Sequence, residues 1–275
     1  MTSKLTNILY VALSYFMGNN TQYPHQSLEL ITHPSSPSLP SSSPLPPPPL
    51  SKPQLPKPSL MVNIPSSTLK TGDLLLYCPS PSKSGIIGFI ENFIRWTTHS
   101  DIVHIAFVLK DPTFLSPDLK GIYLWESCFE NIPDAVDGDI KFGVQIVPLE
   151  EVVRRAKLAG DRMFVRRLTN VFPDTFSEDK LKSIYDVVHN KPYDFIPKHV
   201  IDAIMKRNND PQHTNRFICS ALVGYIYTKC NILHQDTNWS ILLPEDFTPT
   251  SDVTTDNLIY ISNTTLEESM EILKA

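Results

Sequence analysis

Cys219 lies where a reactive thiol would be expected, in the first turn of a strongly apolar helix predicted over residues 217–227. Thr214 or Asn215 can cap this helix. The positive end of the helix dipole and the unpaired backbone N–H groups there stabilise a thiolate, which is the nucleophilic form of cysteine. The same N–H groups could hold the oxyanion of a tetrahedral intermediate. A lone cysteine among apolar residues is usually a small core residue, so catalysis requires further partners.

A cysteine nucleophile needs a base, and the base needs a group that orients it. His104 interrupts the apolar run 102–109, a predicted strand, so its ring must find a hydrogen-bond partner. Glu126 ends the next predicted strand, 122–127, in surroundings too apolar for an idle carboxylate. If the two strands are antiparallel neighbours, Glu126 can fix the tautomer of His104, with both side chains facing the start of the cysteine helix. Taken singly, a satisfied core histidine and a solvated strand end are the alternatives.

The elements expected around these residues indicate an α+β fold. A turn at residues 70–73 leads into a predicted strand at 74–77, and apolar spacing then predicts a helix over 86–97. Strands cluster in the middle of the chain and helices toward its end, which is an α+β pattern. Because the loops between adjacent strands are too short for crossover helices, we expect these strands to pair antiparallel. The remaining predicted elements are strands at 145–148 and 163–168 and helices at 149–157, 178–189 and 197–207.

The first 65 residues differ in composition from the rest. Residues 8–17 are apolar but about half the length that spans a bilayer, so an anchor or signal and a short amphipathic or disordered terminus are both open. Residues 33–65 hold 12 of the 25 prolines and predict an extended linker. The proline run 46–49 could instead dock on a protein partner. The expected organisation is therefore an apolar or disordered segment over 1–32, this linker, and a folded domain over 66–275.

The overall composition excludes some classes of protein. The 275 residues carry a net charge of −5 and no basic stripe, which argues against sequence-independent nucleic-acid binding. The four cysteines form no C-x-x-C pair, so no structural zinc site is expected, and their wide spacing does not resemble a disulfide framework. Reduced thiols in the cytoplasm are the expectation; association with a membrane surface through residues 8–17, or a virion location, is the alternative.

Short motifs follow one another along the chain in a recognisable order: Gly72-Asp73 before a strand, VHIAFVL around His104, LWES around Glu126, PYD around Tyr193, and FICSALV around Cys219. This order resembles the circularly permuted papain-like branch of the NlpC-type cysteine hydrolase superfamily. That group includes bacterial permuted amidase-like enzymes, poxvirus and giant-virus proteins, and lecithin-retinol-acyltransferase-like enzymes. The histidine strand precedes the cysteine helix, which is the permuted order. The resemblance covers roughly residues 69–247 and implies an antiparallel sheet packed against helices.

The resemblance also implies roles for individual residues. Cys219 would be the nucleophile, His104 its base and Glu126 the orienting carboxylate, while His99 is a less suitable base at the end of the preceding helix. Tyr193 matches a position near the active site, where it would contact the oxyanion or the substrate. The enzyme would be a hydrolase or acyltransferase that attacks an amide, ester or thioester, on peptide-like or lipid acyl substrates. No metal or organic cofactor is implied.

Two other interpretations stay open. A non-catalytic papain-like adaptor could use the proline-rich segment 33–65 to recruit a protein partner. A membrane-tethered virion-type protein could use residues 8–17 as its anchor and still be active. The presence of Cys, His and Glu together favours the enzyme. The acidic stretch 131–139 departs from the family pattern and is expected to be a surface loop near the cleft.

Overall fold

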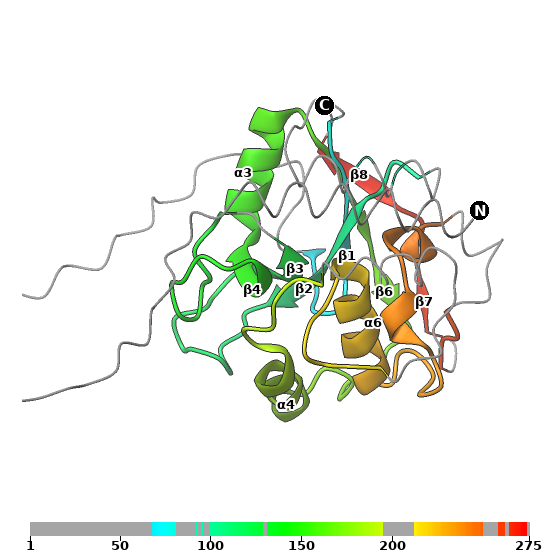
Figure 1. Ribbon diagram of the computed structural model, residues 1–275. Helices are drawn as coiled ribbons and strands as arrows, with labels where there is room; N and C mark the ends of the chain where they lie inside the picture. Colours follow the sequence, from blue (N-terminus) through cyan, green and yellow to red (C-terminus); the bar gives the residue numbers. More distant parts are fainter. Residues whose placement is uncertain are drawn as a thin grey trace, which may run out of the picture.

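The computed structural model places the sheet-forming part of the chain (Figure 1). It describes residues 68–80, 92, 95, 100–128, 131–194, 212–249, 258–261 and 264–273. Both N-terminal segments, His99 and the predicted helix at 197–207 therefore lie outside the described residues. Of the predicted helix at 86–97, only Asn92 and Arg95 are described, and both are helical.

A six-stranded antiparallel sheet forms the centre of the fold. The strands are β1 (Leu74–Cys78), β2 (His104–Lys110), β3 (Ile122–Cys128), β4 (Gly143–Pro148), β5 (Arg162–Arg166) and β8 (Met270–Leu273). Their order is β4-β3-β2-β1-β5-β8, and each neighbouring pair is antiparallel. The predicted α+β class and antiparallel pairing are thus confirmed, whereas β8 was not predicted.

A small second sheet extends the end of β5. The predicted strand at 163–168 is divided: β5 ends at Arg166, and β6 (Leu168–Thr169) pairs antiparallel with β7 (Thr265–Leu266). The segment that carries β7 and β8 therefore runs along β6 and β5 in turn.

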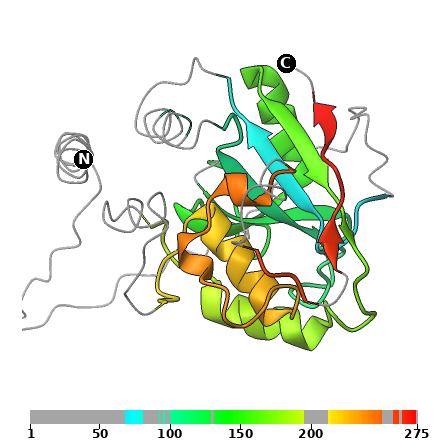
Figure 2. The same cartoon turned by 90° about the vertical axis from the view of Figure 1, so that its right-hand side faces the viewer.

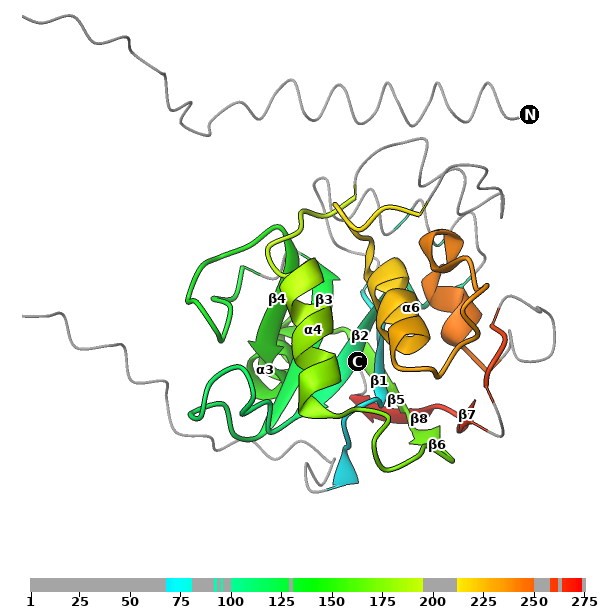
Figure 3. The same ribbon diagram turned by 90° about the horizontal axis from the view of Figure 1, so that it is seen from below.

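Three helices cover the two faces of the six-stranded sheet. Helix α3 (Leu149–Ala159) lies on one face, and α4 (Glu178–Val188) and α6 (Cys219–Lys229) lie together on the other (Figures 2 and 3). Strand alternation divides the core accordingly. The α3 face includes Leu75, Ala106, Val108, Leu124, Val147 and Val152. The α6 face includes Leu76, Ile105, Phe107, Trp125, Ile184 and Leu222.

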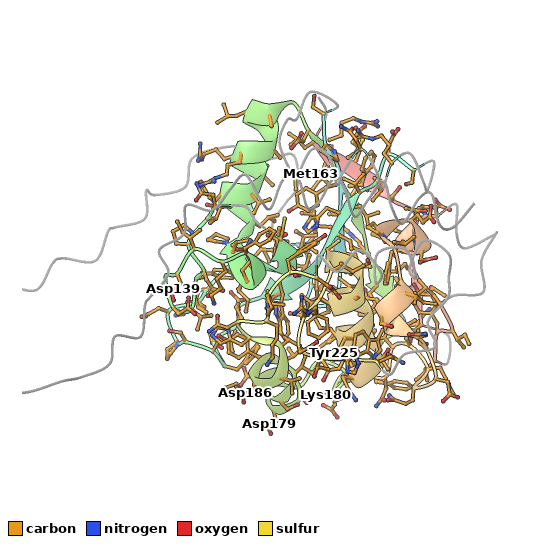
Figure 4. All side chains as sticks on the ribbon, viewed as in Figure 1. Asp139, Met163, Asp179, Lys180, Asp186 and Tyr225 are labelled. Atoms are coloured by element: carbon orange, nitrogen blue, oxygen red, sulfur yellow. The ribbon has the colours of Figure 1, made fainter. Side chains whose placement is uncertain are left out.

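Helix α4 has one apolar stripe. Leu181, Ile184 and Val188 are buried at helical spacing against the sheet. Asp179 and Asp186 are exposed and lie on the outer side of the helix (Figure 4). In the portion of the chain that the structure describes, no helix is long and apolar enough to cross a bilayer.

Helix α6 is apolar on all sides because it is enclosed. Ten of its 11 residues are buried. Gly224 allows the close approach of η2 (Trp239–Ile241), since a Cβ added there would lie 2.6 Å from Leu242 Cδ1 and 3.0 Å from Trp239 Cβ. A side chain at this position would push the helix away from its support.

The helix begins two residues later than predicted, at Cys219. Phe217 is still extended: its N–H donates to Pro192 O, and its carbonyl accepts from Asp194 N. Ile218 is the N-cap, with φ −81° and ψ 165°, and no side chain caps the helix. The predicted cap at Thr214 or Asn215 is therefore wrong, because the backbone bridge through Phe217 keeps the chain extended up to the thiol.

A buried arginine ties the C-terminal part of the described chain to the sheet. Arg166 is 1% exposed at the end of β5. Its Nη1 donates to Phe247 O, at the end of η3 (Pro244–Phe247), over 2.8 Å. Its Nε and Nη2 donate to Glu267 O and Leu266 O over 2.7 and 2.9 Å. The guanidinium thus joins three backbone carbonyls from two segments.

Asp73 comes just before Leu74, the β1 residue that pairs with Arg166 in the sheet, and it is equally buried. Its two carboxylate oxygens accept from the backbone N–H groups of Lys70 and Leu168 over 2.9 and 3.1 Å. Gly72 precedes it at φ 102°, where a Cβ would lie 2.3 Å from the Phe176 ring. These contacts form the predicted turn at 70–73, and we refer to the two buried ionic residues as the Asp73–Arg166 cluster.

Candidate active site

His104 and Glu126 come from neighbouring antiparallel strands. The β2–β3 register pairs Phe107 with Trp125, so Glu126 falls diagonally across from His104. The imidazole Nε2 lies 2.8 Å from Glu126 Oε2, and the side chains are 12% and 0% exposed. Glu126 therefore reaches His104 as the sequence suggested, and their contact is largely shielded from solvent.

Cys219 meets the same ring. It is the first residue of α6 and is 2% exposed, and it lies close enough to the His104 ring to raise the pKa of the imidazole. Because Glu126 engages Nε2, Nδ1 is the ring nitrogen left for the sulfur. The structure thus brings together Cys219, His104 and Glu126, in that order.

The environment of His104 favours its protonated form. Burial by itself would lower the pKa of the imidazole, because it penalises the charged ring. The negative charge and hydrogen bond of Cys219, followed by those of Glu126, act in the opposite direction. Their combined effect raises the His104 pKa well above its usual value. The protonated ring is therefore the favoured state of His104 at neutral pH.

The three residues do not share one face of the sheet. Cys219 belongs to the α6 core. Strand alternation puts Glu126 on the opposite face, with Leu124 and Val147 of the α3 core. The expectation that Glu126 would face the cysteine helix is therefore wrong. His104 is the first residue of β2, and at this strand end its ring can contact groups from both faces.

Two further side chains surround the His104–Glu126 pair. Gln145 lies opposite Glu126 in β4, is 1% exposed, and donates from Nε2 to Glu126 Oε1 over 3.1 Å. Tyr77 lies opposite His104 in β1, and the two ring centroids are 4.9 Å apart. Neither residue was predicted from the sequence to belong to the site. A polar residue inside a buried strand was the available signal for Gln145, as it was for His104.

Tyr193 lies close to the site through its backbone. It forms an isolated parallel bridge with Phe217, two residues before Cys219, and its N–H donates to Phe142 O over 3.1 Å. Its ring stacks on the Phe142 ring, with centroids 5.6 Å apart. The structure therefore brings Tyr193 near the cysteine helix and holds its ring against Phe142.

The start of α6 could hold a developing oxyanion. No side chain caps the helix, so none competes for its first backbone N–H groups. Ser220, next to the thiol, donates from Oγ to Leu242 O over 2.7 Å and so is directed away into the core. This arrangement provides donors beside Cys219 without a dedicated side chain.

The acidic stretch 131–139 folds against β4. Asp134 is 2% exposed and accepts from Ile146 N over 2.9 Å and Val136 N over 2.8 Å. Lys141 Nζ lies 3.0 Å from the same carboxylate. Asp134 thus anchors the stretch to the strand that carries Gln145.

Across the described ranges, no group of three or more His, Cys, Asp or Glu side chains could hold a metal ion. All four cysteines are free thiols.

No protein-family model matches the chain, and no curated protein matches it either.

Proposed function

We propose that the chain is a thiol hydrolase or acyltransferase with a circularly permuted papain-like fold, in which Cys219 is the nucleophile, His104 the base and Glu126 the orienting carboxylate. The observation that carries this proposal is the placement of one imidazole between a thiol at a helix start and a buried carboxylate. A nucleophile, a base and a group that orients the base are the three parts of such a site.

The reaction would proceed through an acyl-enzyme. The Cys219 thiolate attacks the carbonyl carbon of an amide, ester or thioester, forming a C–S bond and a tetrahedral oxyanion near the start of α6. His104 then donates its proton to the leaving amine, alcohol or thiol as the scissile bond breaks. Water or another acceptor, deprotonated by His104, attacks the thioester and releases Cys219. Glu126 keeps the ring oriented and stabilises the imidazolium.

Cys230 provides a matched control for the reactivity of Cys219. The two cysteines flank the same helix and are 1% and 2% exposed, respectively. Burial raises the pKa of the Cys230 thiol to about 12, against the opposing charge of Lys180, and no hydrogen bond to a histidine is described for it. Burial also raises the pKa of the Cys78 thiol. If burial alone decided reactivity, Cys219 and Cys230 would behave alike.

Iodoacetamide labelling of the native protein at mildly acidic pH, followed by peptide mass mapping, tests the proposal. We expect Cys219 to be modified selectively over Cys78, Cys128 and Cys230, because only a thiolate reacts at that pH. Cys219→Ala should remove the labelling, and Cys230→Ala should leave it unchanged. Equal labelling of all four thiols would refute the catalytic role and favour the non-catalytic adaptor.

A further inference from the structure

A fourth side chain continues the line from Cys219 through His104 and Glu126. The Glu126 carboxylate has one oxygen 2.8 Å from the His104 ring and the other 3.1 Å from Gln145 Nε2. Glu126 and Gln145 are directly opposed in the β3–β4 register, and they are 0% and 1% exposed. Both carboxylate oxygens are thus engaged by side chains in a region shielded from solvent.

From this geometry we propose that Gln145 is a positioning residue that fixes the orientation of the Glu126 carboxylate toward His104. The inference rests on the proposed thiol chemistry for its consequence, although the contact itself does not. A carboxylate with a single partner could rotate about its terminal torsion, which has a broad profile. The amide donor on Oε1 restricts that rotation and keeps Oε2 aimed at Nε2.

The chemical type of Gln145 suits this role. A lysine or arginine at the same position would also donate to Oε1, but its positive charge would offset the carboxylate and weaken its effect on the imidazolium. A primary amide donates without adding charge. Gln145 therefore orients Glu126 while leaving its full negative charge to act on His104.

Removing the amide donor tests the proposal. Gln145→Met keeps the length of the side chain but cannot donate. The groups that face His104 are Glu126 from β3, Cys219 from α6 and the Tyr77 ring from β1, and the substitution replaces none of them. We expect the His104 titration, followed by NMR of the ring, to move to lower pH, and alkylation of Cys219 at mildly acidic pH to slow about tenfold.

Val147→Ala is the matched control. Val147 is buried on the same strand and the same face, two residues from Gln145. Its side chain has no polar atom that could bond to Glu126 or His104. Truncating it should lower the melting temperature and leave the His104 titration where it is. If Gln145→Met changes stability alone, as Val147→Ala does, then Gln145 only fills space and the proposal is overturned.

Gln145→Glu distinguishes a hydrogen-bond donor at this position from a side chain that only fills space. A second buried carboxyl beside Glu126 should hold a proton at mildly acidic pH, because two adjacent carboxylates do not both ionise there. It can then donate to Glu126, so we expect alkylation faster than in Gln145→Met. A filler role predicts the reverse order, since methionine suits a buried site better. If Cys219 proves unreactive while His104 still titrates lower in Gln145→Met, the thiol chemistry fails and the positioning role stands.

Discussion

The two ends of β1 lead to two buried polar clusters that are built in different ways. At its start, the Asp73–Arg166 cluster bonds to backbone N–H and C=O groups. At its end, Tyr77 packs against His104, which belongs to a chain of side chains that bond to one another. Both clusters are shielded from solvent, so burial does not distinguish them.

The difference lies in what each cluster can do without unfolding. Backbone partners have fixed charge and protonation, so the Asp73–Arg166 cluster serves to hold segments together. The partners of His104 are Glu126 and Cys219, side chains that can themselves gain or lose a proton. A proton can therefore move within this second cluster while the backbone stays in place, which is what acid–base chemistry requires.

The largest expected effect of breaking either cluster is a loss of stability at Arg166. Arg166→Met removes the donor from three backbone carbonyls, two of them in buried hydrogen bonds, and we expect the free energy of unfolding to fall by about 3–5 kcal/mol. Urea denaturation measures this change. Cys219 alkylation in the protein that remains folded should be unchanged, because the carbonyls that Arg166 bonds belong to Phe247, Leu266 and Glu267 and not to the site.

Arg162→Met is the control on the same strand. Arg162 is 43% exposed and pairs with Glu271 over 2.8 Å. An ion pair this accessible contributes about 0–1 kcal/mol. If both arginine variants lost equal stability, the backbone-bonded cluster would not be the structural anchor described above.

The second expected effect is on reactivity at Glu126. Glu126→Gln preserves the shape of the side chain but removes the charge that supports the imidazolium. We expect the rate of Cys219 alkylation at mildly acidic pH to fall roughly 100-fold, with little change in the urea midpoint. The loss should be smaller than in Cys219→Ala, which removes the nucleophile. If Glu126→Gln instead lowered the stability of the fold and left the alkylation rate of the folded protein unchanged, Glu126 would have the structural role assigned here to Arg166.

The smallest expected effect is the pH dependence of stability. Since the folded-state pKa of His104 is raised, the protonated ring stabilises the fold fully below the unfolded value of about 6.5, and this contribution is lost as pH rises through the folded pKa. Each unit of the shift corresponds to about 1.4 kcal/mol. The gap in unfolding free energy between the native chain and His104→Gln should therefore be widest near pH 6 and shrink in alkaline solution.

Arg166→Met sharpens this measurement. Its stability loss should be the same across that pH range, because a guanidinium and three carbonyls do not titrate there. If the stability lost in His104→Gln were also independent of pH, that result would contradict the raised pKa of His104.

The sequence predicted the strands from their apolar runs and Cys219 from its place at a helix start, whereas His104 and Glu126 stood out as polar residues inside an apolar strand. That signal identified His104 and Glu126, and it was equally present at Gln145, where a neutral amide drew no attention because it does not titrate. It failed at Arg166, since adjacent arginines at a strand end look alike although one is fully buried. Local pattern does not carry the long-range contacts that decide which of the two enters the core.

Other features depended on contacts between distant segments. β8 pairs with β5 across more than 100 residues, and a four-residue strand has little pattern of its own. The start of α6 was misplaced because the bridge through Phe217 is set by Pro192 and Asp194, far back in the chain. The face on which Glu126 lies likewise follows from the register with Ala106 and Gln145.

The position of α6 after the strands has a consequence for the order of synthesis. β1 to β5 form a contiguous antiparallel set over residues 74–166, complete before Cys219 is translated. The ribosome therefore releases His104 and Glu126 first, on strands that neighbour one another in the sheet. Cys219 emerges last of the three, so its sulfur meets the His104 ring only after the strands that carry His104 and Glu126 have been made.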